Sequence, residues 1–394
     1  MLYLDHNATT PVLPAVIEAM GEALRRHWAN PSSQHEAGQA ARGALQHARA
    51  QVARCLGCQP AELVFTSGAT EANHIALRGA VGHGGRGGLV ISAAEHAGVH
   101  KLVQQLGRQP GPQGVPVGVI GMQPSGALDL AAAEALIGEA TALVSVMAAN
   151  NETGVLMPTA EIARLAHARG ALLHVDATQL IGKLPFDFAR SGADLVSVSA
   201  HKFGGPKGVG ALIVRKGLNW PALFAGSQER GRRGGTENLP GIVGFGVAAE
   251  HQAWTAGNWH DRSAKLAALR DRFEARLRTA CPELAVYGAS QPRLPQTSFL
   301  RLGHAHADLA LHKLSSLGAL ASSGSACSSG GQAASHVLAA MGVPREEALC
   351  AVRLSFSPDT PAADLLALAD AWPRLVSEAH ACSTVSHPPT GVAA

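Results

Sequence analysis

Short apolar runs alternate with amphipathic helical patterns through the first two-thirds of the chain, and this alternation restricts the fold more than any other feature. Runs of this kind are typical of strands that are buried on both faces of a sheet. Their alternation with helices predicts an α/β fold with a mostly parallel, doubly wound sheet and helices on both faces. The predicted strands are residues 63–66, 89–92, 143–147, 172–175 and 195–198, and the predicted helices are 14–26, 39–56, 70–81, 98–106, 130–138 and 158–168.

The pattern changes in the last third of the chain, which indicates a second region. Residues 264–279 have the pattern of a charged amphipathic helix, and the later apolar runs are more widely separated (285–287, 296–301 and 351–356). A chain of 394 residues is long enough for one large and one small domain. We therefore expect a large domain over 13–255, a smaller α+β domain over 1–12 and 256–382, and a disordered tail over 383–394.

The composition argues against several classes of protein. The net charge is +3 with acidic and basic residues mixed, so nothing indicates a nucleic-acid surface or a polybasic membrane arm. We see no secretory signal, and no apolar stretch approaches the roughly 20 residues that a membrane helix needs. The 6 cysteines are scattered without a framework, which is typical of a reducing compartment, so we expect a cytoplasmic protein.

A strand-to-helix turn at residues 65–71, with the sequence Phe-Thr-Ser-Gly-Ala-Thr-Glu, is a candidate anion site. Small residues at such a turn leave backbone N–H groups free at a helix N-terminus, where they can bind a phosphate. The Thr70 hydroxyl would add one more donor. The alternative is an ordinary capped turn, in which Thr70 and Glu71 only begin the helix.

Two polar residues follow predicted strands, at the sheet edge where ligands bind in open α/β folds. Asp176 follows the run 172–175, and Lys202 follows the run 195–198. A lysine amine can form an imine with an aldehyde, and an aspartate can keep a pyridinium nitrogen protonated. These are the two protein groups that pyridoxal phosphate (PLP) most needs. The alternatives are a metal ligand, a base or, most commonly, a helix cap for Asp176, and a solvated side chain for Lys202.

The neighbours of these two residues add further donors. Ser199 and His201 flank Lys202 and could bind a phosphate, while the Gln179 amide could reach a phenolate oxygen. His96 offers an aromatic face for a ring, although it is one of 19 histidines and carries little weight alone. The single CxxC at 55–58 lacks further zinc ligands, so we interpret it as the end of a helix.

Cys327 differs from the other cysteines because it lies in a run made only of small residues, Ser-Ser-Gly-Ser-Ala-Cys-Ser-Ser-Gly-Gly over 322–331. Nothing in this run can anchor a core, so we expect a flexible, exposed loop. A mobile thiol suits a nucleophile that has to travel. The alternative is a surface loop with an incidental cysteine.

A cluster of basic residues lies at 229–233 and has two interpretations, a solvated loop or an anion site.

Taken together, these segments resemble the class V PLP enzymes and, within them, the NifS/IscS-like cysteine desulfurases. The resemblance extends over nearly the whole chain. The long cysteine loop resembles the first of the two desulfurase groups, and the run 229–238 is similar to the nitrogen-fixation (NifS) type. The matching motifs lie at 3–10, 30–33, 66–71, 95–96, 150–154, 175–179, 199–202 and 229–238 and in the Cys327 loop.

The resemblance implies a fold-type I PLP enzyme and a role for each matching residue. Lys202 would hold the cofactor as an imine and move protons, and Cys327 would take up sulfur as a persulfide. Arg353 would bind the substrate carboxylate, for which a structural salt bridge is the alternative. Thr236 would reach the phosphate of the neighbouring subunit, which implies a homodimer. The other cofactor contacts would be Asp176 at the pyridine nitrogen, Gln179 at the phenolate oxygen, His96 on the ring, and Ala69, Thr70, Ser199 and His201 at the phosphate. Asn151 would contact the cofactor or the substrate near the phenolate oxygen.

The implied reaction converts L-cysteine to L-alanine and passes the sulfur to an iron–sulfur scaffold or a sulfur-carrier protein. The alternatives are a related enzyme such as a selenocysteine lyase or an aminotransferase, for which Cys327 would be dispensable, and a role in binding alone. The sequence departs from the family pattern in two places. Residues 331–336 lack the Leu-Glu-Pro often found after the loop, and Ser357-Pro358 replaces a common glycine. We expect no metal site.

Overall fold

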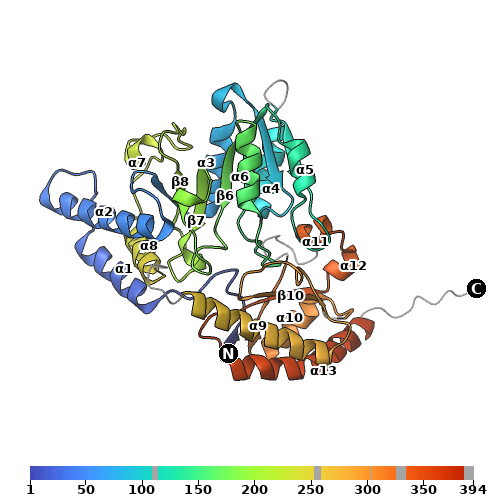
Figure 1. Ribbon diagram of the computed structural model, residues 1–394. Coiled ribbons are helices and arrows are strands. Elements are labelled where there is room, and N and C mark those ends of the chain that lie inside the picture. The colour runs from blue at the N-terminus through green and yellow to red at the C-terminus, as the bar shows by residue number, and fades with distance from the viewer. Residues whose placement is uncertain (109–113, 253–258, 302, 325–333, 386–394) are drawn as a thin grey trace, which may run out of the picture.

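The computed structural model describes residues 1–108, 114–252, 259–301, 303–324 and 334–385. A seven-stranded sheet with the order β2-β8-β7-β6-β5-β3-β4 forms the centre of the larger part (Figure 1). Only β8 within this sheet is antiparallel to its neighbours, so the mostly parallel sheet is confirmed. The strands are β2 (Leu63–Thr66), β3 (Gly88–Ser92), β4 (Val117–Ile120), β5 (Thr141–Met147), β6 (Leu172–Asp176), β7 (Leu195–Ser199) and β8 (Gly210–Val214).

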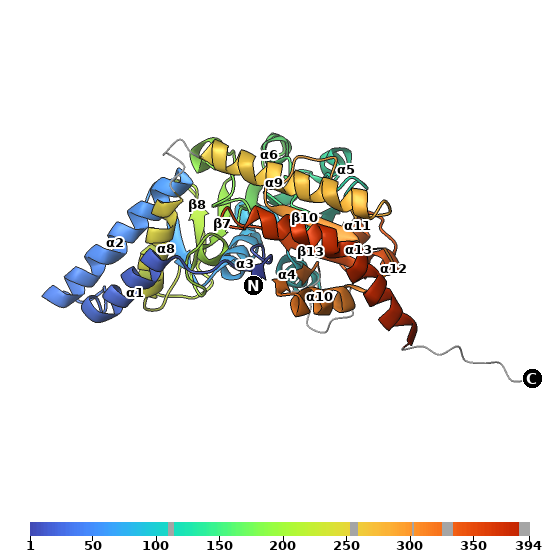
Figure 2. The same ribbon diagram turned by 90° about the horizontal axis from the view of Figure 1, so that it is seen from below.

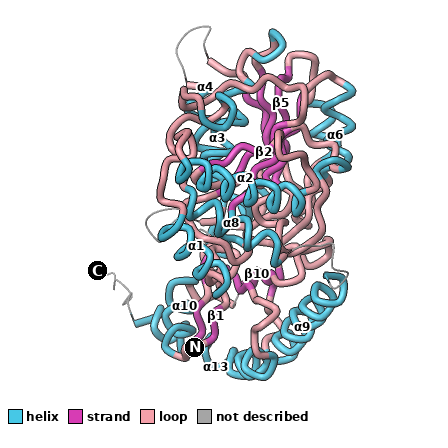
Figure 3. The backbone as a smooth tube through the Cα atoms, turned by 90° about the vertical axis from the view of Figure 1, so that its left-hand side faces the viewer, coloured by secondary structure: helices cyan, strands magenta, loops and turns pink. Residues whose placement is uncertain are grey.

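Successive strand residues point into two hydrophobic cores, one on each face of the sheet. In β2, for example, Val64 packs with α3 and α4, whereas Leu63 and Phe65 pack with α2 and α8. Figure 3 shows α3 and α4 on one side of the sheet and α6 on the other, which is the predicted doubly wound arrangement. The helices of this part are α1 (Pro14–Arg26), α2 (Glu36–Leu56), α3 (Ala69–Ala80), α4 (Ala97–Gly107), α5 (Leu130–Leu136), α6 (Thr159–Ala168), α7 (Gln228–Gly231) and α8 (Leu239–His251), with 3-10 turns at His83–Gly85, Phe188–Arg190 and Ala200–Lys202.

A second, four-stranded sheet with the order β12-β13-β10-β9 has its own core. The long helices α9 and α13 lie side by side along it (Figure 2) and bury Phe273 and Trp372. No helix within the described ranges has the length and apolar character that crossing a membrane requires. The elements of this part are β9 (Ala285–Val286), β10 (Thr297–Arg301), β12 (Ser322–Ser323), β13 (Ala351–Ser355), α9 (Trp259–Ala280), α10 (Ala307–Ser316), α11 (His336–Ala340), α12 (Arg345–Ala348) and α13 (Ala362–Val385).

The N-terminal segment, residues 1–13, connects the two sheets. It begins as β1 (Leu2–Tyr3), which pairs in parallel with β11 (Ala319–Leu320), and Asp5 then bridges to Ser355. Further along, the backbone N–H groups of Thr10 and Leu13 donate to carbonyl groups beside Lys202. The segment therefore joins the second sheet to the edge of the first.

One predicted boundary is wrong. We expected a disordered tail from residue 383, but α13 continues to Val385. Once a helix has formed, each further residue that becomes ordered gains one backbone hydrogen bond, so extension costs much less than starting a new helix. A few polar residues therefore do not end α13. Residues from 386 on lie outside the described part of the chain, and the limits of the two predicted domains stay a prediction.

A buried ion pair joins α2 to the start of the basic cluster. The Arg49 guanidinium donates to both carboxylate oxygens of Glu229, at 2.5 and 3.0 Å, and the two side chains are only 4% and 2% exposed. Glu229 also accepts the backbone N–H of Phe65 at 2.9 Å. Its φ of +49° lies in the left-handed region, which disfavours a residue other than glycine. This cluster therefore contains a buried structural carboxylate, which neither interpretation of the sequence included.

We predict that Glu229→Ala lowers the free energy of unfolding by about 3–5 kcal/mol, because Arg49 would remain buried without its counter-ion. Urea unfolding followed by circular dichroism measures this change. The matched control is Glu22→Ala, which removes an exposed ion pair with Arg26 and should leave the unfolding midpoint unchanged. Equal midpoints for the two variants would contradict the structural role of Glu229.

Candidate active site

A cavity of about 610 Å³ lies at the carboxyl ends of β6 and β7, beside the N-terminus of α3. Its volume is typical of small-molecule sites. The structure brings most of the predicted site residues together here: Ala69, Thr70, His96, Asn151, Asp176, Gln179, Ser199, His201, Lys202 and Arg353 all line the cavity. Thr236 is exposed and does not line it, and Cys327 lies outside the described residues.

Asp176 is the last residue of β6, and its carboxylate is held from two sides. One oxygen accepts the side-chain N–H of Asn73 at 2.8 Å, and the other accepts the backbone N–H of Thr178 at 3.0 Å. The residue is 6% exposed. Asn73 lies on α3, one turn after the 65–71 motif, and sequence reasoning missed it because its role depends on how α3 packs against β6.

Lys202 ends the short turn after β7, and its amine points to the N-terminal segment. Its Nζ atom donates to the backbone oxygens of Asn7 at 2.7 Å and Ala8 at 2.9 Å. The solvated alternative for this lysine is therefore wrong. Residues 7–9 line the cavity and lie in one of the matching motifs, but no local pattern predicted a role for them.

The N-terminus of α3 has the form that an anion site requires. Gly68 precedes the helix with φ of +157°, and the first residues of α3, Ala69 and Thr70, line the cavity together with Ser199 and His201. The first backbone N–H groups of a helix have no partner within it and can bind an anion. Burial, followed by the nearby positive charges of Lys202, Lys207 and Lys183, lowers the pKa of His201 to about 4. His201 is therefore a neutral hydrogen-bonding group at neutral pH.

His96 caps α4 as well as lining the cavity. Its Nδ1 atom accepts the backbone N–H of Gly98 at 3.1 Å, so the ring proton lies on Nε2 when the histidine is neutral. Burial lowers the pKa of His96, which favours this neutral form. The cap fixes the ring at the cavity wall, where it can pack against a planar ligand.

Arg353 belongs to β13 of the second sheet and forms a salt bridge with Asp5. A structural salt bridge was the alternative to a role in binding the substrate carboxylate. Its guanidinium donates to Asp5 at 2.7 Å and to the backbone oxygen of Asn151 at 3.1 Å. The Nε atom is buried and has no hydrogen-bond partner among the described residues. Arg353 therefore keeps unused donor capacity at the cavity.

These residues fit PLP, the cofactor that the resemblance implies. Asp176 is a buried carboxylate for a pyridine nitrogen, Lys202 is an amine on the same cavity, and the α3 N-terminus is a phosphate cradle.

The CxxC pair, Cys55 and Cys58, lies at the end of α2, as the sequence predicted. Burial raises the pKa of the Cys58 thiol to about 12.

Behind Asp176 lies a buried carboxyl group that sequence reasoning missed. One oxygen of Glu95 accepts the Ser92 hydroxyl at 2.7 Å and the Met147 backbone N–H at 2.6 Å, while the other has no partner among the described residues. Burial, together with the negative charge of Asp176, raises the pKa of Glu95 to about 8. Glu95 is therefore a neutral acid over most of the physiological range.

The raised pKa predicts how stability depends on pH. The pKa of Glu95 in the folded protein, about 8, exceeds the ordinary value of 4.5. Its contribution to the free energy of unfolding is therefore complete below pH 4.5 and is lost as the pH rises through 8. Compared with Glu95→Gln, the wild-type protein should lose up to about 4 kcal/mol of unfolding free energy between pH 5 and pH 8. Urea unfolding at both pH values measures this. The exposed control Glu134→Gln should follow the wild type, and parallel curves for Glu95→Gln would contradict a neutral Glu95.

Comparisons with known proteins agree with this geometry. The sequence matches the aminotransferase class-V family over residues 2–368. A cysteine desulfurase of Cereibacter sphaeroides is 42% identical over 385 residues, which cover 97% of this chain and 97% of that protein. A cysteine desulfurase of Nostoc sp. is 40% identical over 395 residues, covering 99% and 96%. The solved structure of a NifS-like protein has a TM-score of 0.87 at 32% identity, covering 96% of this chain and 99% of that one. The chain therefore belongs to the aminotransferase class-V family and is similar to its cysteine desulfurases over nearly the whole length.

Proposed function

We propose that this protein is a PLP-dependent cysteine desulfurase, which converts L-cysteine to L-alanine and keeps the sulfur as an enzyme persulfide. One observation carries the proposal: Lys202, Asp176 and the N-terminus of α3 meet in a single cavity, in a chain similar to cysteine desulfurases from end to end. The amine, the carboxylate and the phosphate cradle come from three different elements. An incidental arrangement would not place all three around one cavity.

The residues that would hold the cofactor follow from their chemistry. Asp176 would pair with the pyridine nitrogen, and Gln179 and Asn151 would lie at the phenolate end. The ring would pack against His96, and Ala69, Thr70, Ser199 and His201 would bind the phosphate. When bound, PLP supplies an electron sink for a substrate carbon that loses a proton.

Lys202 and Arg353 would act on the substrate itself. The Lys202 amine would be the base that takes the α-proton and returns a proton to the product carbon. Arg353 would orient the substrate carboxylate, for which its buried and partnerless Nε offers a donor. Its bond to Asp5 holds the guanidinium at the cavity and partly balances its charge.

Both ends of the segment that contains Cys327 are attached to the wall of this cavity. Before it, Ser322 of β12 is paired with Arg353 of β13. After it, the Ser335 hydroxyl donates to the fully buried carboxyl group of Glu152, the residue next to Asn151. These attachments support the proposal that the Cys327 thiol reaches the substrate.

The proposed sulfur transfer is balanced without an external oxidant. The Cys327 thiolate attacks the sulfur of L-cysteine, an S–S bond forms, and the C–S bond of the substrate breaks. The carbon gains a proton and leaves as L-alanine. The enzyme thiol and L-cysteine thus become an enzyme persulfide and L-alanine.

Replacement of Cys327 tests this proposal. We expect Cys327→Ala to lower alanine formation from L-cysteine by at least about a hundredfold, because no other group is assigned to accept the sulfur. The matched control is Cys281→Ala, which removes a free, partly exposed cysteine beyond the cavity. An unimpaired Cys327→Ala variant would contradict the persulfide step and would favour a related PLP activity.

The finer parts of the function belong to the same proposal. The persulfide would pass to an iron–sulfur scaffold or a sulfur-carrier protein, and the NifS-like resemblance favours a role in nitrogen fixation. Co-purification of the wild-type protein with its acceptor, compared with Cys327→Ala, would identify the partner. If the same proteins co-purified with the wild type and with Cys327→Ala, this would argue against transfer of the persulfide to any of them.

A homodimer is also part of the proposal. Thr236 is exposed and lies apart from its own cavity, as expected if it contacts the phosphate bound by a second subunit. We predict sedimentation at twice the chain mass of 40.5 kDa. A species of the monomer mass that still binds PLP with full affinity would contradict the shared site.

A further inference from the structure

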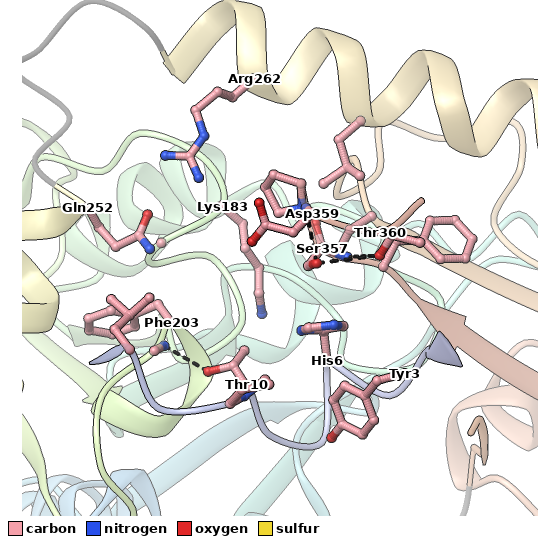
Figure 4. A pocket seen from close by; sticks show the side chains of 18 of the residues that line it. Tyr3, His6, Thr10, Lys183, Phe203, Gln252, Arg262, Ser357, Asp359 and Thr360 are labelled. Carbon is pink, nitrogen blue, oxygen red and sulfur yellow. Dashed lines mark hydrogen bonds between the residues drawn. The ribbon is translucent and has the colours of Figure 1, made fainter. Parts of the chain in front are cut away.

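A second cavity, of about 570 Å³, lies on the other side of the N-terminal segment from the first. Lys202 lines both cavities, whereas Lys183 lines only the second. Figure 4 shows the Lys183 side chain reaching into this space, with its amine end toward His6 and the N-terminal segment. The mechanism above assigns no role to Lys183.

The Lys183 amine contacts a residue of the first cavity. Its Nζ atom donates to Oε1 of Gln179 at 2.6 Å, and Nε2 of the same amide donates to the backbone oxygen of Asn7 at 2.9 Å. Gln179 is 5% exposed, so solvent has little access to its amide. Asn7 also accepts the Lys202 amine, so the two lysines meet the same short network from opposite sides.

The chemistry of the amide gives this contact a consequence. The Lys183 amine donates to the Gln179 oxygen, and this bond favours the orientation of the amide in which that oxygen faces Lys183. The NH2 group of Gln179, a residue that lines the cofactor cavity, then donates one N–H to the Asn7 oxygen and has a second N–H to offer. A phenolate oxygen can only accept, so the opposite orientation of the amide would place two acceptors against each other.

The position of Lys183 is maintained by packing. Its turn contains Gly182 with φ of +81°, and a side chain at Gly182 would collide with Phe203, next to Lys202.

The electrostatic surroundings of Lys183 disfavour its charged form. Burial and the positive charges of Lys202 and Arg353 lower the pKa of Lys183 well below the ordinary lysine value. The other ionisable residues that line its cavity are Met1 with its N-terminal amine, Tyr3, His6, Lys202, His251, Arg262 and Asp359.

We propose that Lys183 is a positioning residue: by donating to Gln179 it orients that amide so that its NH2 group binds the phenolate oxygen of PLP. This inference rests on the proposed role of Gln179 in the cofactor site. A hydrogen bond to the phenolate oxygen would stabilise its negative charge. That charge would then hold the proton on the nearby nitrogen of Lys202 less strongly, so the pKa of this nitrogen would be lower. Lys183 therefore helps to set the pH at which this nitrogen loses its proton.

The test is a pH titration of the visible absorption band of the PLP-loaded protein. We expect Lys183→Met to raise the midpoint by about one pH unit, which corresponds to the loss of one hydrogen bond. Lys183→Arg keeps a donor and should stay within a few tenths of a unit of the wild type. Lys216→Met, an exposed lysine beyond both cavities, is the matched control and should leave the midpoint unchanged.

A double-mutant cycle separates positioning from a simple charge effect. If Lys183 acts through Gln179, Lys183→Met should cause no further shift in a Gln179→Leu background. An equal shift in both backgrounds would overturn the inference, and so would an unchanged midpoint in Lys183→Met alone. If Lys183→Met does not fold, Lys183→Leu, whose side chain also lacks a donor, takes its place.

The same experiment distinguishes this inference from the proposed function. A wild-type protein that binds no PLP and shows no visible band would contradict the cofactor site itself. A wild-type band with a normal titration, together with an unshifted Lys183→Met band, would contradict only the role of Lys183.

Discussion

The site depends on one buried residue of the N-terminal segment, Asn7. Its backbone N–H donates to the Ser355 hydroxyl at 2.9 Å, and its side-chain amide donates to the Thr297 hydroxyl at 2.9 Å, both in the second sheet. Its backbone oxygen accepts the Lys202 amine and the Gln179 amide from the first sheet. A buried peptide group that lost these partners would be costly, so the network strongly favours one relative position of the two sheets.

This constraint explains how residues from distant parts of the chain share one cavity. Asp176 and Lys202 lie at strand ends of the large sheet, whereas Arg353 projects from β13 of the small one. In the proposed site, the groups for the cofactor ring belong to the large sheet and the group for a substrate carboxylate belongs to the small one. A reaction on a bound amino acid requires both to be placed within a fraction of an ångström, which two independently moving parts could not achieve.

Sequence reasoning succeeded where the signal was local. Asp176 and Lys202 could be found because each follows an apolar run, and the carboxyl ends of parallel strands meet at one edge. The helix α1 and the strand β2 have their predicted bounds for the same reason. By contrast, α8 is apolar on all sides and shows no periodicity, so no amphipathic pattern marked it.

The contacts that reasoning missed depend on tertiary packing. Asn73 and Glu95 bind partners more than 40 residues away, Asp176 and the Met147 backbone. Lys183 binds Gln179, four residues before it, but the role of that contact depends on the packing of Gln179 against Asn7. Nothing in their own neighbourhoods separates them from ordinary polar residues. The resemblance to a family supplied roles for Thr236 and Cys327, and these stay predictions.

The central claim is that this chain moves sulfur from L-cysteine to its own Cys327. The most direct measurement is a single turnover of the PLP-loaded protein with L-cysteine and no reductant, followed by mass spectrometry of its peptides and quantification of alanine. We predict one extra sulfur atom on the peptide that contains Cys327, in equal amount to the L-alanine formed. Alanine without that persulfide, or a persulfide on another cysteine, would contradict the account.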